Sequence, residues 1–196
     1  MRVFGIDPGS ERTGYGCVET DGRRHRLVIF GAISAKADDA FPVRLARIHR
    51  ELSSILATCR PDCVAVENVF HAANVRSALK LGHARGVAML AAVEAGCAVA
   101  EYTPAEVKRA VVGHGRAEKH QVQQMVKLLL GLARAPSPHD ASDALAVALC
   151  HAHSAPLAGL ARAVSAAETR AALAAPASPR ARLPRSWRQY RPPAHG

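Results

Sequence analysis

The chain has 196 residues, of which 49% are hydrophobic and 4% aromatic, and this length suits one domain with at most an appendage. Its 26 Lys and Arg outnumber its 16 Asp and Glu, and the net charge of +10 indicates a polyanionic partner, nucleic acid before a membrane surface. No apolar run approaches the roughly 18 residues of a transmembrane helix, and Asp7 lies where a signal peptide would be apolar. These features exclude a membrane protein, a disulfide miniprotein and a wholly disordered chain.

The positive charge is concentrated in the last part of the chain. Residues 154–196 hold seven Arg, one Glu and six of the twelve Pro. Because this segment has few large apolar residues, we predict a basic, disordered tail over 154–196, with at most a short helix around 161–173. Its role is either to keep the protein soluble or to bind nucleic acid as an arm. Residues 1–153 are predicted to form the folded domain.

Hydrophobic periodicity divides residues 1–153 into strands and helices. An antiparallel meander of three strands comes first, and parallel crossover units follow it. This order predicts an α/β domain with a mixed five-stranded sheet flanked by helices, the ribonuclease H-like fold. The predicted strands are 2–7, 13–20, 25–34, 63–67 and 97–102, and the predicted helices are 42–58, 75–95, one that begins at 104, 117–130 and 139–153.

Four carboxylates at the ends of predicted strands and on the last predicted helix suggest a metal site. Asp7 and Glu67 each end an apolar strand, and Asp140 and Asp143 share one face of the last helix. The three aspartates also have a structural explanation, namely a strand-end turn for Asp7 and the helix dipole for Asp140 and Asp143. The four together would repel one another without a cation, and oxygen ligands favour Mg²⁺ or Mn²⁺. Two such ions are suited to phosphodiester hydrolysis.

Basic side chains accompany these acids. A glycine-containing loop at 113–115 precedes a predicted helix, and Lys119 lies just inside that helix. The backbone amides of 113–117 and Lys119 are therefore placed to hold a phosphate. A solvated helix face is the alternative, and it suits Lys127 and Arg134. The candidate nucleic-acid contacts are Arg76, Lys80, Lys108, Arg116 and Lys119.

The order of several motifs resembles a known family, the RuvC-type crossover junction endodeoxyribonucleases, which are Holliday-junction resolvases. The resemblance covers roughly residues 1–153. The stretches that carry it are 4–16 (FGIDPGSERTGYG), 66–87 (VENVFHAANVRSALKLGHARGV), 107–126 (VKRAVVGHGRAEKHQVQQMV) and 139–151 (HDASDALAVALCH).

The resemblance implies roles for single residues. Phe70 matches an aromatic residue that stacks on a base, Lys108 and Lys119 match lysines near the scissile phosphate, and the helix 75–95 matches the dimer-forming helix. Two positions depart from the family pattern, because Ala73 replaces an expected lysine and His83 an expected glutamine. His139, next to Asp140, is interpreted as a loop histidine, and a role at the water or the metal stays the alternative. The matched catalytic metal ligands are Asp7, Glu67, Asp140 and Asp143.

The resemblance also implies an activity. The expected enzyme is a cytoplasmic, nucleoid-associated homodimer that uses Mg²⁺ and nicks two strands of like polarity in a four-way DNA junction during recombination and repair. The nicks would carry 5′-phosphate and 3′-hydroxyl ends, and the expected partners are RuvA and RuvB. Two alternatives stay open: a nuclease of the same fold acting on another substrate such as precursor rRNA, and a junction-binding protein that does not cut. The intact set of four acids argues against the second.

Overall fold

One mixed sheet organises the domain, as predicted. The computed structural model describes residues 1–35, 38–68 and 74–158. The strand order is β3-β2-β1-β4-β5, in which β1–β2 and β2–β3 are antiparallel pairs and β1–β4 and β4–β5 are parallel pairs. This is the order of the ribonuclease H-like fold, which confirms the predicted fold class. The strands are β1 (Arg2–Asp7), β2 (Arg12–Thr20), β3 (His25–Ser34), β4 (Cys63–Glu67) and β5 (Ala98–Tyr102).

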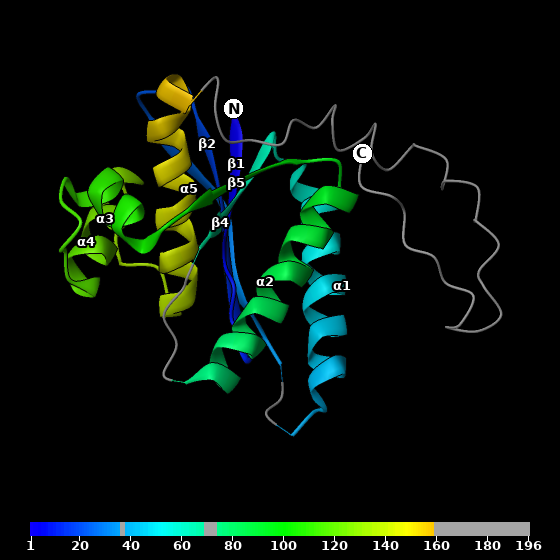
Figure 1. The fold of residues 1–196 in the computed structure, drawn as a ribbon. Coiled ribbons are helices and arrows are strands. Elements are labelled where there is room, and N and C mark those ends of the chain that lie inside the picture. Colours follow the sequence, from blue (N-terminus) through cyan, green and yellow to red (C-terminus); the bar gives the residue numbers. More distant parts are fainter. Residues whose placement is uncertain (36–37, 69–73, 159–196) are drawn as a thin grey trace, which may run out of the picture.

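Helices cover both faces of this sheet. In Figure 1, α1 and α2 pack on one face, and α5 packs on the other with α3 and α4 beyond it. None of the helices in the described ranges is long and apolar enough to cross a membrane. The helices are α1 (Phe41–Cys59), α2 (Val75–Glu94), α3 (Pro104–Val112), α4 (Lys119–Leu129) and α5 (His139–Ala158).

Side chains alternate between the two faces along the central strand β1, because successive residues of a strand point in opposite directions. Phe4 and Ile6 are fully buried in the core under α1 and α2. Val3 belongs to the second core, which α5 fills with Leu145 and Leu149. This two-sided burial explains why β1 is a continuous apolar run that ends at Asp7.

Glycines let α5 lie directly against the sheet. A Cβ added at Gly5 would lie 2.0 Å from the carbonyl oxygen of Ala144, and one at Gly14 would lie 2.0 Å from that of Asp140. Real side chains do not fit at such distances, so any larger residue at either position would push the helix away. The glycines of β1 and β2 therefore fix the start of α5 beside the end of β1.

Some boundaries differ from the sequence prediction. Helix α5 continues to Ala158, past the predicted end at 153. Helix α4 begins at Lys119 rather than 117, since Glu118 and Gln121 form a capping box at that point. The rest of the predicted tail, including the helix expected around 161–173, lies outside the described residues.

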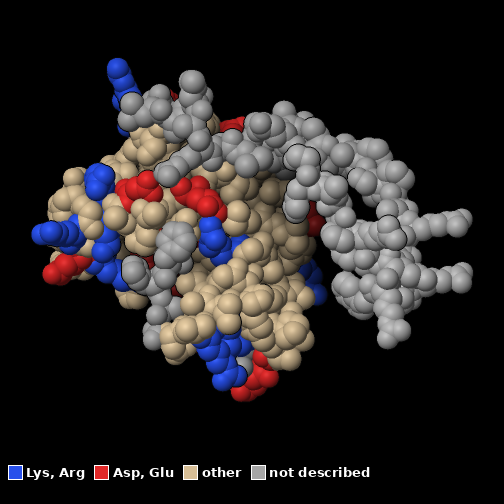
Figure 2. All heavy atoms as spheres, viewed as in Figure 1, with Lys and Arg blue, Asp and Glu red and all other residues tan. Residues whose placement is uncertain are grey.

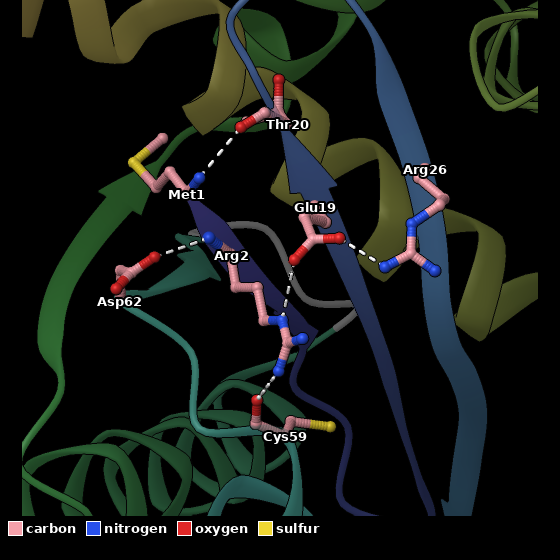
Figure 3. Close-up of polar contacts among 7 residues, drawn as sticks. All are labelled: Met1, Arg2, Glu19, Thr20, Arg26, Cys59 and Asp62. Atoms are coloured by element: carbon pink, nitrogen blue, oxygen red, sulfur yellow. Dashed lines mark hydrogen bonds and ion pairs between the residues drawn. The ribbon is translucent and has the colours of Figure 1, made fainter.

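A polar network joins neighbouring elements where β1 begins, at the far end of this strand from Asp7. Arg2 is at the centre of the network (Figure 3). Its Nε donates to the Glu19 carboxylate at 3.2 Å, its Nη1 donates to the Cys59 carbonyl at 3.1 Å, and its backbone N–H donates to the Asp62 carboxylate at 2.7 Å. These bonds join β1 to β2, to the end of α1 and to the loop before β4. The acidic edge described next is therefore distant from the contacts that lock the strand starts together.

Candidate active site

Asp7 and Glu67 lie side by side where β1 and β4 end. The two strands are parallel neighbours, and their register pairs Ile6 with Val66, the residues just before the acids. The carboxyl groups of Asp7 and Glu67 share a hydrogen bond. Polar groups at the carboxyl ends of parallel strands are where open α/β sheets bind ligands.

The start of α5 brings two more carboxylates to this edge. Asp143 and the strand-end acids line a hollow of about 350 Å³, together with Lys108 and Lys119. Lys119 Nζ lies 2.6 Å from Asp143 Oδ2. Asp140 lies one turn earlier and does not line this hollow; its Oδ2 lies 3.6 Å from Arg12 Nη1. The closeness of α5 to β1 and β2, which Gly5 and Gly14 permit, positions both aspartates.

The acids disfavour one another's charge. Burial raises the pKa of Asp7 to about 9, and the charges of Glu67, Asp143 and Asp140 add to this effect. Burial also raises the pKa of Glu67, while the hydrogen bond from Asp7 opposes the shift. Asp7 is therefore the proton donor in the shared hydrogen bond. A bound cation would favour the ionised form of these buried, mutually repelling carboxylates. Carboxylate oxygens are hard donors that suit Mg²⁺ or Mn²⁺.

Asp140 and Asp143 each form a salt bridge with a basic side chain. Within the described ranges, no three His, Cys, Asp or Glu side chains converge closely enough to hold a metal ion as the side chains stand. Arg12 and Lys119 are the partners of the two aspartates, and their side chains are 54% and 62% exposed. Exposed ion pairs of this kind contribute little stability. The aspartates are therefore free to exchange these partners for a cation at small energetic cost.

The predicted basic contacts fall into two groups. Lys108 and Lys119 line the acidic hollow itself. Arg116 is exposed between α3 and α4, Arg76 is exposed in the first turn of α2, and Lys80 lies over the ring of Phe41 at 6.0 Å. Figure 2 shows basic side chains gathered over α3 and α4, with acidic side chains beside them toward the centre of the view.

Other predicted residues lie elsewhere or cannot be placed. Phe70 and Ala73 fall outside the described residues. His139 is the first residue of α5, and its Nδ1 accepts a hydrogen bond from the Gln123 amide at 2.6 Å, so its ring is tied to α4. The pairing of Arg12 with Asp140 was missed by sequence reasoning, because the two residues are far apart in the chain and no motif connects them.

The fold and the acidic edge together define the class of ribonuclease H-like nucleases, in which carboxylates at the ends of the central strands cluster beside a helix. The comparisons specify the family. The family model described as crossover junction endodeoxyribonuclease RuvC matches residues 3–151. The chain therefore belongs to the RuvC family of crossover junction endodeoxyribonucleases.

Individual relatives agree with this assignment. The chain is 55% identical to the RuvC of Koribacter versatilis over 154 residues, which is 78% of this chain and 93% of that protein. It is 56% identical to the RuvC of Geotalea uraniireducens over 160 residues, 82% of this chain and 93% of that one. The structure of Thermus thermophilus RuvC in complex with a Holliday-junction substrate superposes with a TM-score of 0.79 at 40% identity, and the match covers 84% of this chain and 99% of that one.

Proposed function

We propose that this protein is a metal-dependent endonuclease that resolves four-way DNA junctions by paired, symmetric nicks during recombination and repair. One observation carries the proposal: Asp7, Glu67 and Asp143 line one hollow with Lys108 and Lys119 at the carboxyl edge of the sheet. Acids that hold a cation and lysines that attract a phosphate suit metal-dependent phosphodiester hydrolysis.

The four acids are the proposed metal ligands, with Asp7 and Glu67 from the strands and Asp140 and Asp143 from α5. We expect Mg²⁺, which Mn²⁺ can replace, and two ions per subunit. Bound there, the ions would activate a water molecule and stabilise the leaving oxygen. The chain's contribution is to hold the two strand-end carboxylates within hydrogen-bonding distance of each other, and a bound cation would take the place of their shared proton.

Lys108 and Lys119 have a different role in the proposal. Both reach the acidic hollow, one from α3 and one from the first turn of α4. Lys119 pairs with Asp143, and a cation held by Asp143 would leave this lysine available to the scissile phosphate. Its positive charge would then stabilise the charge that develops on the phosphate oxygens.

The DNA is proposed to lie across the carboxyl edge of the sheet. Arg76, Lys80 and Arg116 would contact its backbone on either side of the hollow. The stacking role of Phe70 rests on the family resemblance alone. The same holds for the branch-migration partners RuvA and RuvB and for association with the nucleoid.

A homodimer is proposed to form through α2. Val75, Leu79 and Leu90 are 77%, 61% and 48% exposed, although they are large and apolar. Between them, Gly82 and Gly86 have nothing within 4 Å of an added Cβ, so they leave a shallow open surface on this face. A two-fold contact through such a face would place two active sites on symmetric strands of one junction.

The test compares three labelled substrates, each with and without Mg²⁺: a four-way junction, a plain duplex and an RNA–DNA hybrid. The proposal expects cutting of the junction alone, and only with Mg²⁺. Preferred cutting of the hybrid would indicate a nuclease for another substrate, and tight junction binding without cutting would indicate a binding protein.

A further inference from the structure

The two aspartates at the start of α5 each pair with a basic side chain from a different element. Arg12 Nη1, at the start of β2, lies 3.6 Å from Asp140 Oδ2. Lys119 Nζ, in the first turn of α4, lies 2.6 Å from Asp143 Oδ2. Lys119 also lines the acidic hollow, whereas Arg12 does not. Arg12 is therefore a cation beside a proposed metal ligand for which the reaction has so far supplied no role.

The backbone of Arg12 is fixed at the carboxyl edge of the sheet. Because β2 runs antiparallel to β1, it begins at the edge where β1 ends, and Arg12 pairs there with Ser34, the last residue of β3. A Cβ added at Gly9 would lie 2.1 Å from the Arg12 carbonyl oxygen. Thr13 Oγ1 also donates to the Gly9 carbonyl at 2.8 Å, which closes the turn before β2. Arg12 thus stands at the edge across which the DNA is proposed to lie.

The side chain of Arg12, in contrast, can change partner easily. It is 54% exposed, and an ion pair as open as this contributes little stability. Among the carboxylates of residues 1–35, 38–68 and 74–158, Asp140 is its one ion-pair partner. A metal ion bound by Asp140 would compete with the guanidinium for the same charge. The guanidinium would then have N–H donors without an acceptor, and phosphate oxygens suit such donors.

The neighbouring ion pair lacks this property. Glu11 Oε1 lies 3.9 Å from Arg44 Nη1, and the Glu11 side chain is 74% exposed, but that of Arg44 is only 7% exposed. A buried guanidinium cannot leave its partner to reach DNA outside the protein. Glu11 and Asp140 are thus two acids paired with arginines, of which only the partner of Asp140 is free to move outward.

We propose that Arg12 contacts the DNA backbone only when Asp140 serves as a metal ligand. Arg12 neutralises Asp140 in the metal-free protein and binds a phosphate at the carboxyl edge once the carboxylate holds the ion. The inference rests on the proposed junction-cleaving function and adds to it a coupling between metal and substrate. Because such coupling is reciprocal, bound DNA should also raise the affinity of the protein for the ion.

The first test measures junction affinity across a salt series in EDTA. Asp140→Asn should release Arg12 without any metal, so the salt slope should grow by about 0.9, the effect of one phosphate contact on duplex DNA. Such a change is a loss of affinity about 3- to 4-fold greater between about 50 and about 200 mM salt. Adding Arg12→Met to Asp140→Asn should return the slope to that of the wild type. The matched control is Glu11→Gln, which removes the same charge from the neighbouring pair and should leave the slope unchanged, because Arg44 is buried.

The second test repeats the salt series with the wild type and Arg12→Met in Ca²⁺, a hard cation that carboxylates bind, with the DNA strands checked to remain intact. The two proteins should have nearly equal slopes in EDTA and slopes that differ by about 0.9 in Ca²⁺. This comparison decides alone if Asp140→Asn does not fold.

Three results would overturn the inference. They are equal slopes for Asp140→Asn and Glu11→Gln, an increase that survives in the double variant, and a difference between the wild type and Arg12→Met that is the same in EDTA and Ca²⁺. A wild type that cuts junctions with Mg²⁺ and gives any of these results would overturn the role of Arg12 alone. A wild type that binds or cuts no junction would instead refute the proposed function.

Discussion

Replacing Asp7 by Asn is expected to stabilise the protein in the absence of divalent cations, although the variant should not cut DNA. Asp7 holds its proton in the folded state because burial and three neighbouring acids raise its pKa to about 9. The unfolded chain releases that proton at the ordinary pKa of 3.8. Folding at neutral pH therefore includes an unfavourable proton uptake, which an amide avoids.

The size of this effect follows from the pKa difference. Proton uptake costs about 1.4 kcal/mol for each pH unit above the unfolded pKa, or about 4 kcal/mol at pH 7. An Asn side chain can still donate an N–H to Glu67, so most of the cost should be recovered, about 2–4 kcal/mol. For a domain of this size that gain corresponds to a rise in Tm of about 4–16 °C.

The raised pKa of Asp7 also fixes the direction in which stability changes with pH. The folded protein keeps a proton that the unfolded chain has lost, so the free energy of unfolding of the wild type should fall as pH rises from about 4 to 9. Asp7→Asn should lose the part of this slope that Asp7 contributes, while the raised pKa of Glu67 still gives a slope of the same sign. Adding Mg²⁺ should raise the Tm of the wild type, since the ion binds the folded state, and should raise that of the variant much less.

The assay is thermal unfolding in EDTA at pH 5, 7 and 9. Asp21→Asn is the matched control, because the backbone N–H groups of Arg24 and Arg23 lower the pKa of that exposed carboxyl group and it lies far from the acidic edge. It should not raise the Tm. An Asp7→Asn protein that melts at or below the wild-type temperature at pH 7 and 9 would show that Asp7 is ionised without strain, which would refute the reasoning.

Three further predictions concern DNA and assembly. Lys119→Met should reduce cleavage by about 10²–10³-fold through lost charge stabilisation, with Lys127→Met at the other end of α4 as the control, and equal rates for the two would remove Lys119 from the reaction. Leu79→Glu should give monomers in sedimentation, whereas Leu128→Glu, at an apolar position of similar exposure (69% against 61%), should stay dimeric; an intact Leu79→Glu dimer would move the interface away from this face. A chain ending at Ala158 should keep its Tm, and its junction affinity should have a salt slope smaller by about 2–3 units if roughly three tail arginines reach phosphates at once, so equal slopes would show that the tail does not contact DNA.

Much of the fold is predictable because the pattern of apolar residues in the sequence matches the faces that are buried in the structure. The run at 3–6 is apolar throughout because β1 is covered on both faces, and the spacing of Ile48 and Leu52 predicts the buried side of α1. Asp7 and Glu67 break apolar strands at their ends, and the crossover between parallel strands requires those ends to share an edge. The position of both acids could therefore be predicted without the structure.

The partners of the acids could not be predicted. The bonds of Asp140 to Arg12 and of Asp143 to Lys119 depend on how closely α5 approaches β2 and α4, and this distance is set by the absent side chains of Gly5 and Gly14.

Mapping the cuts in a four-way junction tests the central claim most directly. Each strand is end-labelled in turn, and the wild type is compared with Glu67→Gln, which retains the size of the side chain and loses its charge. With Mg²⁺, the wild type should nick two strands of like polarity at symmetric positions and leave ends that a ligase reseals, while Glu67→Gln should bind the junction and leave every strand intact. Normal cutting by Glu67→Gln, or symmetric cutting by the wild type in EDTA, would contradict a metal-dependent junction nuclease built on these carboxylates.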